Sequence, residues 1–408
     1  MINLSIGVSL SGLDVVLAQF GEGIWGQVIS LIMFIVFIFF YQRIMVTQIL
    51  FKLEKSAQAL ENMSDKAKKT VMKKISKKPD SKLKRSINRF LEFFVISPVS
   101  LDPYGVVKKL EHLIDLEKDR FKYFVNQMAP KLDSEQKANT MMGLSGAISL
   151  YMLSKLVRHF VELIKKTKSI NLAMILQMQL PLIERLARAL LHGTEALANG
   201  WPVGDTIGAY TAAALVGNSR VIEVDDETVV CRKKYKKRDV IIVKAKGPGG
   251  RTGNPGRVVE KIVRKWKIAK IITIDAALKL EGEKTGTIAE GIGVAIGGIG
   301  VEKTYIENIA VKKKLPLDSI IIKMSQEDAI TPMKKEILNS VPIVTQALDA
   351  AIDRTKDKGK IIVVGVGNTS GVGNNKKDVE KAKELIKKNI KKIKALAKKK
   401  KKKFRFPF

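Results

Sequence analysis

The chain has 408 residues, and Lys and Arg outnumber Asp and Glu by 73 to 40, which gives a formal net charge of +33 at pH 7. A field of that size attracts anions, so we expect lipid headgroups, nucleic acid or acidic proteins as partners. The single cysteine, Cys231, excludes an internal disulfide, and three scattered histidines share no metal-ligand spacing.

An uncharged stretch near the N-terminus predicts a transmembrane helix. It reads IWGQVISLIMFIVFIFFY from Ile24 to Tyr41, a length that suits the hydrocarbon core of a bilayer. A cleaved signal peptide would need positive charges before it, whereas no Lys or Arg precedes Arg43. Lysines follow Arg43 closely, so the positive-inside rule predicts a single-pass protein of the cell membrane, with the N-terminus outside and the bulk in the cytoplasm. A buried core helix is the alternative interpretation.

We divide the chain into six segments. In order, they are an extracytoplasmic tip, the transmembrane helix, basic juxtamembrane helices, a helical subdomain, an α/β domain and a Lys-rich amphipathic tail. Their ranges are 1–22, 23–42, 43–100, 101–200, 201–375 and 376–408. Two further apolar runs, 141–153 and 170–183, are short for a membrane span, so we expect buried or interfacial helices there.

From about Trp201, short β-branched runs alternate with helical stretches. We expect strands at 221–224, 240–245, 271–275, 319–324 and 360–366. Nearly continuous apolar strands alternating with helices predict a mainly parallel sheet flanked by helices. The predicted fold class is therefore an α/β C-terminal domain, preceded by an all-helical region and one N-terminal transmembrane helix.

Two glycine-rich loops, GPGGRTGNPG (247–256) and GVGNTSGVGN (365–374), each join a strand to a helix. Glycines allow backbone amides to approach an anion closely at a helix N-terminus. Neither loop carries the dinucleotide fingerprint or a P-loop, so the motifs name no nucleotide. The predicted anion-binding residues are Gly247, Gly249, Gly250, Thr252, Gly253, Asn254, Gly365, Gly367, Asn368, Gly371 and Gly373.

Two aspartates are candidate catalytic residues. Asp275 ends the expected strand IITID, and an acid at the C-terminal end of a parallel strand lies where α/β folds bind ligands. Asp205 stands in VGDTIGAYTAAAL at an expected helix start, where a simple N-cap is the alternative. No Ser/His/Asp or Cys/His set is apparent, so acyl-enzyme chemistry is not expected.

The tail from Lys376 predicts a basic amphipathic helix, whose apolar stripe includes Val379, Ile386 and Ile393. It ends KKKKKKFRFPF, and this pattern favours insertion into an anionic membrane surface. RNA binding and a solvated, disordered tail are the alternatives.

The run KGPGGRTGNPGRVVEKIVRK, followed by AKIITIDAALKLEGEKTGTIAEGIG, resembles the core of spore germination proteases, a family that shares its fold with hydrogenase maturation endopeptidases. GDTIGA (204–209) is similar to the second marker of that family. The resemblance implies that Asp205 and Asp275 are paired acids and that a divalent metal is a candidate cofactor. The whole chain also resembles an archaeal family of membrane-anchored proteins with no assigned function.

We therefore hold three hypotheses. The first is a binding or scaffold module on the inner membrane face, with a maturation-peptidase-like α/β domain. The second is a membrane-tethered hydrolase, a peptidase, whose aspartates polarise a water or hold a metal. The third is an RNA-binding membrane protein. Anionic lipids, RNA, an acidic protein or a second copy of the chain are the expected partners, and the sequence names no substrate.

Overall fold

The computed structural model describes residues 24–95, 105–296 and 300–403. The expected extracytoplasmic tip (1–22) and the last five residues lie outside the described residues. The chain divides into two compact units, residues 1–59 with 155–182 and residues 60–154 with 183–408.

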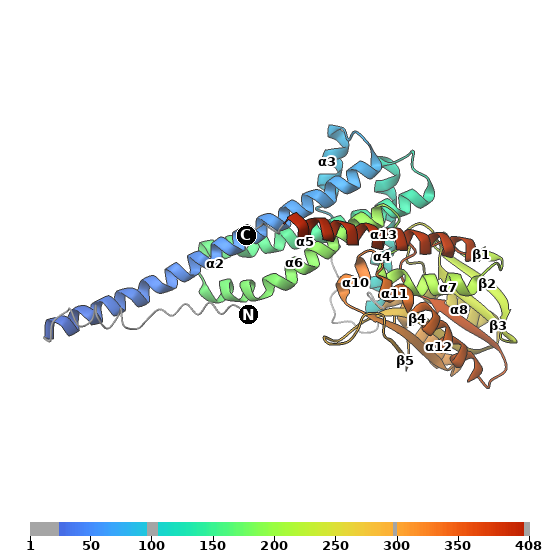
Figure 1. Ribbon diagram of the computed structural model, residues 1–408. Coiled ribbons are helices and arrows are strands. Elements are labelled where there is room, and N and C mark those ends of the chain that lie inside the picture. Colours follow the sequence, from blue (N-terminus) through green and yellow to red (C-terminus); the bar gives the residue numbers. More distant parts are fainter. Residues whose placement is uncertain (1–23, 96–104, 297–299, 404–408) are drawn as a thin grey trace. The chain divides into compact units, whose positions relative to one another are not determined.

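Helices fill the described chain as far as residue 198 (Figure 1). They are α2 (Ile24–Ile75), α3 (Ser81–Phe90), α4 (Val106–Met128), α5 (Ser134–Thr167) and α6 (Ile170–Ala198). The predicted helical region before the α/β domain is therefore confirmed. α2 is one continuous helix of 52 residues, so no break separates the predicted transmembrane and juxtamembrane segments.

The first unit contains the beginning of α2 and sections of α5 and α6. Glu54 of α2 makes ion pairs with Arg158 (2.5 Å) and Lys165 (2.7 Å) of α5. Every side chain from Leu31 to Phe37 is exposed, so this stretch of α2 is apolar on all faces.

Among the described helices, α5 is the one that is long and apolar enough to cross a membrane. Of its most apolar 18-residue window, 39% is buried, and the core helix of a soluble protein meets the same criterion. The described apolar stretch of α2, Val28–Phe37, is shorter. The span at 23–42 therefore stays a prediction.

Seven strands form one mixed sheet in the second unit. Along the sheet they are ordered β1-β2-β3-β7-β4-β6-β5. Their bounds are β1 Val221–Glu223, β2 Thr228–Tyr235, β3 Arg238–Ala245, β4 Ile268–Leu278, β5 Ile288–Ile292, β6 Leu317–Met324 and β7 Lys360–Gly365. The central strands β3, β7, β4 and β6 are parallel, whereas β1, β2 and β5 pair antiparallel.

The mainly parallel sheet expected from the sequence is thus corrected to a mixed one. β2 is not among the strands expected from the sequence. It joins β3 through Lys236 and Lys237, both with positive φ (48° and 61°). A two-residue turn of this kind can only connect antiparallel neighbours.

Helices cover both faces of the sheet. α7 (Ile207–Val216), α11 (Lys335–Asn339), α12 (Val341–Asp353) and α13 (Lys376–Lys403) pack on one face, and α8 (Pro255–Lys265) and α9 (Val301–Lys313) pack on the other. Two short elements, η1 (Gly204–Thr206) and α10 (Gln326–Ile330), complete the described secondary structure.

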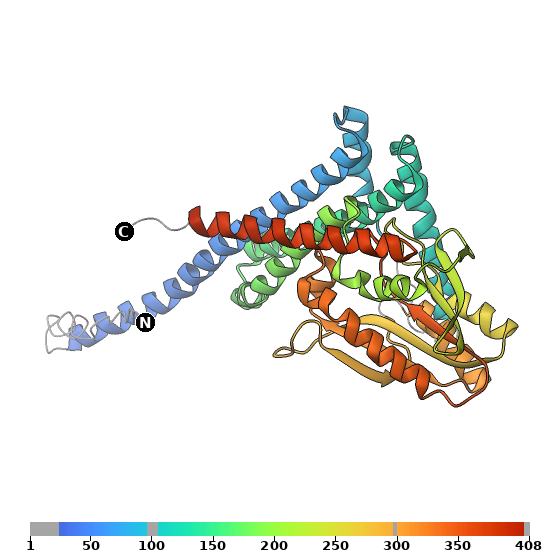
Figure 2. The ribbon, with the colours of Figure 1, turned by 45° about the vertical axis from the view of Figure 1, so that its right-hand side comes forward.

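The basic C-terminal helix α13 runs beside α7 (Figure 2). Val379, Ala382 and Ile386 are buried in the core that α7 and α12 share, whereas Ile393 and Leu396 are 48% and 53% exposed. The pattern of the tail favoured insertion of the whole apolar stripe into a membrane surface, with RNA binding and a solvated tail as alternatives. The first half of the stripe instead belongs to the α/β core, so only the end of the tail is left for an external partner.

Candidate functional site: an acidic cavity at the sheet edge

The candidate site lies where the parallel strands end. Lys244 of β3 opposes Gly365 of β7, and Gly365 also opposes Ile274 of β4. The loops that follow β3 and β7 therefore meet at one edge of the sheet, beside the second half of β4. Open α/β sheets bind ligands at this carboxyl edge.

Asp275 lies in β4, one residue beyond the last residue that pairs with β7. β4 continues to Leu278 through its pairing with β6, so the expectation that Asp275 ends the strand is corrected. The side chain is 3% exposed, and its Oδ1 accepts the Ala276 N–H at 2.7 Å.

Asp205 belongs to the short helix η1, just before α7. Its Oδ2 accepts the N–H of Asn368 at 2.8 Å, from the loop after β7. The carboxylate is therefore bound to a distant loop and does not serve as a local N-cap of α7. Burial raises the pKa of Asp205, and the Asn368 N–H offsets part of that rise because it stabilises the ionised form.

A glycine explains how η1 and α7 come this close to the strand ends. Gly208 lies against the carbonyl oxygens of Val366 and Ile274, and a Cβ on Gly208 would collide with both. The GDTIGA motif thus combines an acid with the close backbone approach that brings the acid to the sheet edge.

Asp205 and Asp275 line one cavity of about 470 Å³. The predicted loop residues Thr252, Gly253, Asn254 and Gly367 also line it. The structure therefore brings together both predicted aspartates and parts of both glycine-rich loops.

The cavity is acidic, although the chain as a whole is strongly basic. Six carboxylates line it, from Glu111, Asp115, Glu117, Asp205, Asp275 and Glu302, against two cations, Lys118 and Arg257. Arg257 pairs with Glu111 (2.8 Å) and Asp115 (2.7 Å), and Lys118 pairs with Glu227 (3.2 Å). Burial raises the pKa of Glu117 and of Glu302. Because both cations already have carboxylate partners, the cavity favours a cationic or neutral ligand.

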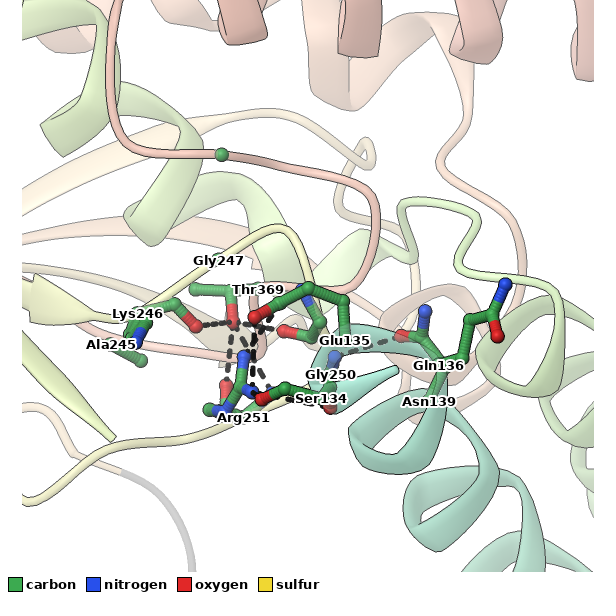
Figure 3. Close-up of polar contacts among 12 residues, drawn as sticks. Ser134, Glu135, Gln136, Asn139, Ala245, Lys246, Gly247, Gly250, Arg251 and Thr369 are labelled. Carbon is green, nitrogen blue, oxygen red and sulfur yellow. Dashed lines mark hydrogen bonds and ion pairs between the residues drawn. The ribbon is translucent and has the colours of Figure 1, made fainter. Parts of the chain in front are cut away.

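The two glycine-rich loops hydrogen-bond to each other (Figure 3). The fully buried Thr369 Oγ1 donates to a backbone carbonyl of the first loop and lies 2.9 Å from Lys246 O and 2.7 Å from Gly249 O. In return, Thr369 N–H donates to Arg251 O (3.0 Å), and Gly371 N–H donates to Pro248 O (2.9 Å). Asn374 adds two further hydrogen bonds between the loops, since its side chain accepts from Gly247 N–H and donates to Gly247 O, both at 3.0 Å.

Amides that could bind an external anion already have acceptors. Glu135 of α5 accepts from Gly249 N–H at 2.5 Å and from Arg251 Nη1 at 2.7 Å, and Asn139 accepts from Gly250 N–H at 2.8 Å (Figure 3). At the N-terminus of α8, Glu302 accepts the Gly256 N–H at 2.5 Å. Carboxylates of the protein thus stand where an external anion was expected.

The predicted anion-binding residues therefore fall into two groups. Thr252, Gly253, Asn254 and Gly367 line the cavity, and the others lie in the strand end and the interlocked loops, namely Gly247, Gly249, Gly250, Gly365, Asn368, Gly371 and Gly373. Glu135 and Glu302 are not among the site residues predicted from the sequence. Each is an ordinary acid in the first turn of a helix, and no local pattern marks its distant partner.

Asp205 and Asp275 are the carboxylates that a divalent metal would use here. Within the described ranges, however, no group of three or more His, Cys, Asp or Glu side chains is placed to hold a metal ion. Zinc takes at least three protein ligands. The residues present do not fit such a centre, and the chemistry proposed below uses no metal.

These features define a protein with a helical N-terminal region and a mixed-sheet α/β domain that carries an acidic cavity at its carboxyl edge. Two family models match the chain: the N-terminal domain of DUF1512, a protein of unknown function, over residues 27–200, and the DUF1512 C-terminal domain over residues 203–373. The chain belongs to the DUF1512 family. No curated protein and no solved structure matches it.

Proposed function

We propose that the α/β domain is a hydrolase in which Asp205 and Asp275 form an acid–base pair. One observation carries the proposal: two aspartates separated by 70 positions in the sequence line the same cavity, at the carboxyl edge of the parallel strands. The resemblance to spore germination and maturation peptidases is consistent with this pairing and makes a peptide bond the candidate target.

The roles of the two acids follow from their surroundings. Burial raises the pKa of Asp205, so we assign Asp205 the role of proton donor to the leaving amine. Asp275 accepts a proton from water as the water oxygen attacks the carbonyl carbon. The C–N bond then breaks, and the amine leaves with the proton from Asp205.

The charge of the cavity defines the substrate class. Six carboxylates against two paired cations favour a basic peptide over an acidic one. The full chain in detergent should therefore cleave Lys- and Arg-rich peptides and leave Asp- and Glu-rich peptides intact.

Point variants test the mechanism. Asp205→Asn and Asp275→Asn should each reduce peptide cleavage by at least about 100-fold, since general acid and base groups contribute factors of this size. Asp226→Asn is the matched control, because Asp226 is exposed and its ion pair with Lys122 lies at the surface. Full activity in either site variant would contradict the proposal.

A non-catalytic binding module is the second candidate, and one observation favours it. The N–H groups of Gly249, Gly250 and Gly256, which could stabilise an oxyanion, already bind protein side chains. Binding of basic peptides that depends on Asp205 and Asp275, with no cleavage of any peptide, would support the binding module over the hydrolase.

We further propose that residues 24–41 anchor the protein in the cell membrane, with the α/β domain in the cytoplasm. The exposure of seven consecutive large apolar side chains, Leu31 to Phe37, supports this anchor over a buried core helix. Met33→Lys with Phe34→Lys should move the protein from carbonate-washed membranes to the soluble fraction. Lys66→Gln with Lys69→Gln should not, and an unchanged distribution of the first variant would refute the anchor.

A further inference from the structure

The parallel strands begin at the sheet edge opposite the cavity, and this edge is strongly basic. Val240 of β3 opposes Ile361 of β7, Lys360 of β7 opposes Ile268 of β4, and Ile271 of β4 opposes Leu317 of β6. The four strand starts therefore lie side by side. The segments that lead into them are far apart in the sequence but share this edge.

We call these four segments the basic rim: residues 232–239, 261–267, 312–318 and 353–360. Together they hold seventeen Lys and Arg but four Asp. The basic residues are Arg232, Lys233, Lys234, Lys236, Lys237, Arg238, Lys261, Arg264, Lys265, Lys267, Lys312, Lys313, Lys314, Arg354, Lys356, Lys358 and Lys360. Most of these side chains are exposed, so the excess of positive charge faces solvent.

Local structural roles explain some of the Lys and Arg side chains of the rim. α8 and α9 both end at this edge, and cations in the last turn of a helix offset its partial negative charge. Lys236 pairs with Asp353 (2.6 Å), and Lys360 pairs with Asp239 (3.3 Å). Several exposed cations have no ion pair among the described residues, including Lys234, Lys237, Lys267, Lys314, Lys356 and Lys358. Their number is larger than the structural roles require.

Trp266 organises part of the rim. Its ring lies 4.9 Å from Lys360 Nζ, 5.7 Å from Arg232 Cζ and 6.0 Å from Lys265 Nζ. Cation–π attraction holds these charges near one another, although they come from β7, β2 and α8. Charges fixed in this way are suited to successive anionic groups of one polymer.

The rim contains charge without apolar anchors. None of the large hydrophobic residues that are exposed in the described chain falls within its four segments. Helices that lie on a bilayer combine basic residues with inserted apolar side chains, whereas nucleic-acid backbones are bound mainly through Lys and Arg. The composition of the rim therefore fits a water-soluble polyanion better than a lipid surface.

We propose that the basic rim binds the phosphodiester backbone of a nucleic acid, on the opposite edge of the sheet from the acidic cavity. Binding through phosphates positions the polymer without reading its sequence. The inference is independent of any chemistry in the cavity and of the C-terminal tail.

Fluorescence anisotropy of a labelled 20-nucleotide single-stranded RNA tests the proposal, with the full chain held in neutral-lipid nanodiscs. The rim variant combines Arg232→Gln, Lys234→Gln, Lys265→Gln and Lys267→Gln. The control removes the same number of charges from exposed lysines of α2 and of the segment just after it, with Lys66→Gln, Lys69→Gln, Lys73→Gln and Lys77→Gln. Both variants have the same net charge, so only the position of the lost charge differs.

The rim variant should bind RNA at least about tenfold more weakly near 100 mM salt, and the slope of log affinity against log salt should fall by about 3, because each lost phosphate contact removes about 0.7. The control should keep the wild-type slope. Lys234→Arg, Lys265→Arg and Lys267→Arg together should retain binding, which separates loss of charge from misfolding.

Two outcomes would overturn the proposal. An equal loss of RNA affinity in the rim and control variants would mean that the affinity depends only on the net charge of the protein. Unchanged RNA affinity in the rim variant would show that the rim does not bind the nucleic-acid backbone.

Discussion

Asp205 shows how a side chain in the site lowers the stability of the fold. Its pKa is raised by burial, so the native state holds the proton more tightly than the unfolded chain, whose carboxyl has a pKa near 3.8. Between these two pKa values the native state binds more protons, and stability therefore falls as pH rises through that window. This loss of stability persists at neutral pH, above the pKa of the unfolded carboxyl.

We predict that Asp205→Asn raises the free energy of unfolding at pH 7, although it removes the proposed activity. The amide oxygen can still accept the Asn368 N–H, and the group whose ionisation is disfavoured by burial is gone. Urea unfolding from pH 4 to pH 8 should show a difference between variant and wild type that grows with pH. Asp226→Asn should change stability by less than about 0.5 kcal/mol, and a neutral-pH loss in Asp205→Asn would contradict the assigned cost.

Lys244 is a second costly residue, and its effect has the opposite sign. The side chain is fully buried on β3, where its Nζ donates to Ala245 O (2.7 Å), Gly373 O (3.2 Å) and Asn374 Oδ1 (2.8 Å). Burial lowers the pKa of Lys244 to about 7, and the nearby Asp378 offsets part of the shift. Between pH 7 and about 10.5 the unfolded chain binds more protons, so stability rises with pH.

We therefore predict that unfolding free energy increases between pH 7 and pH 10 by up to about 1.4 kcal/mol per pH unit from this residue. Lys244→Met should abolish that slope. Chemical denaturation at several pH values gives the slope directly. Lys233→Met provides the control, because Lys233 is a partly exposed lysine whose Nζ also donates to backbone carbonyls. An unchanged slope in Lys244→Met would show that another group titrates in this range.

At the scale of elements, the first turn of α5 stabilises the first glycine-rich loop. The Arg251 side chain is 9% exposed and depends on Glu135, which also accepts the Gly249 N–H. Removal of Glu135 would leave a nearly buried charge and an amide without an acceptor. Both losses are costly in a low-dielectric environment.

We predict that Glu135→Ala lowers the free energy of unfolding by about 3 kcal/mol. Glu260→Ala, which removes an ion pair with Arg264 on the surface of α8, should cost less than about 0.5 kcal/mol. Thermal and urea unfolding of the two variants make the comparison. Similar small losses in both would mean that α5 does not hold the loop.

Elements with a strong local pattern could be predicted from the sequence. The apolar runs that became β3, β4, β6 and β7 were recognised because they are short, β-branched and bounded by turns. β2 was missed because its second half reads RKKY and has no continuous apolar pattern. The apolar stripe of α13 was recognised, but periodicity does not tell whether a stripe faces a membrane or a core, and its first half faces the core.

Only the part of the candidate site that follows from the order of the parallel strands could be predicted from the sequence. Asp275 and the loops had to meet once β3, β4 and β7 were parallel neighbours, and Asp205 joined them through the motif around Gly208. Glu135 lies 116 positions from Arg251, and neither residue carries a local sign of the other. Contacts of this kind depend on tertiary packing, which single-sequence patterns do not encode.

At the scale of the whole molecule, the two family domains share one site. The N-terminal family model ends at residue 200, yet Glu111, Glu117 and Lys118 of α4 line the cavity of the C-terminal domain. Glu135 and Asn139 of α5 hold its first loop as well. The boundary between the family models therefore does not separate two independent functional parts.

We predict that a fragment spanning residues 203–408 folds with an unprotected loop. Hydrogen exchange should show fast exchange at the Gly249 and Gly250 amides, which lose Glu135 and Asn139 as acceptors. A fragment spanning 105–408 keeps α4 and the start of α5 and should keep both amides protected. Equal protection in the two fragments would show that the α/β domain orders this loop unaided.

The opposite charges at the two edges of the sheet give the α/β domain a permanent electric dipole. Carboxylates gather where the parallel strands end, and the basic rim gathers where they begin. A negatively charged surface or polymer exerts a torque on such a dipole and turns the basic edge toward itself. The acidic cavity then faces away from that surface or polymer. An anionic partner on the basic rim would therefore not block the entry of a cationic substrate into the cavity.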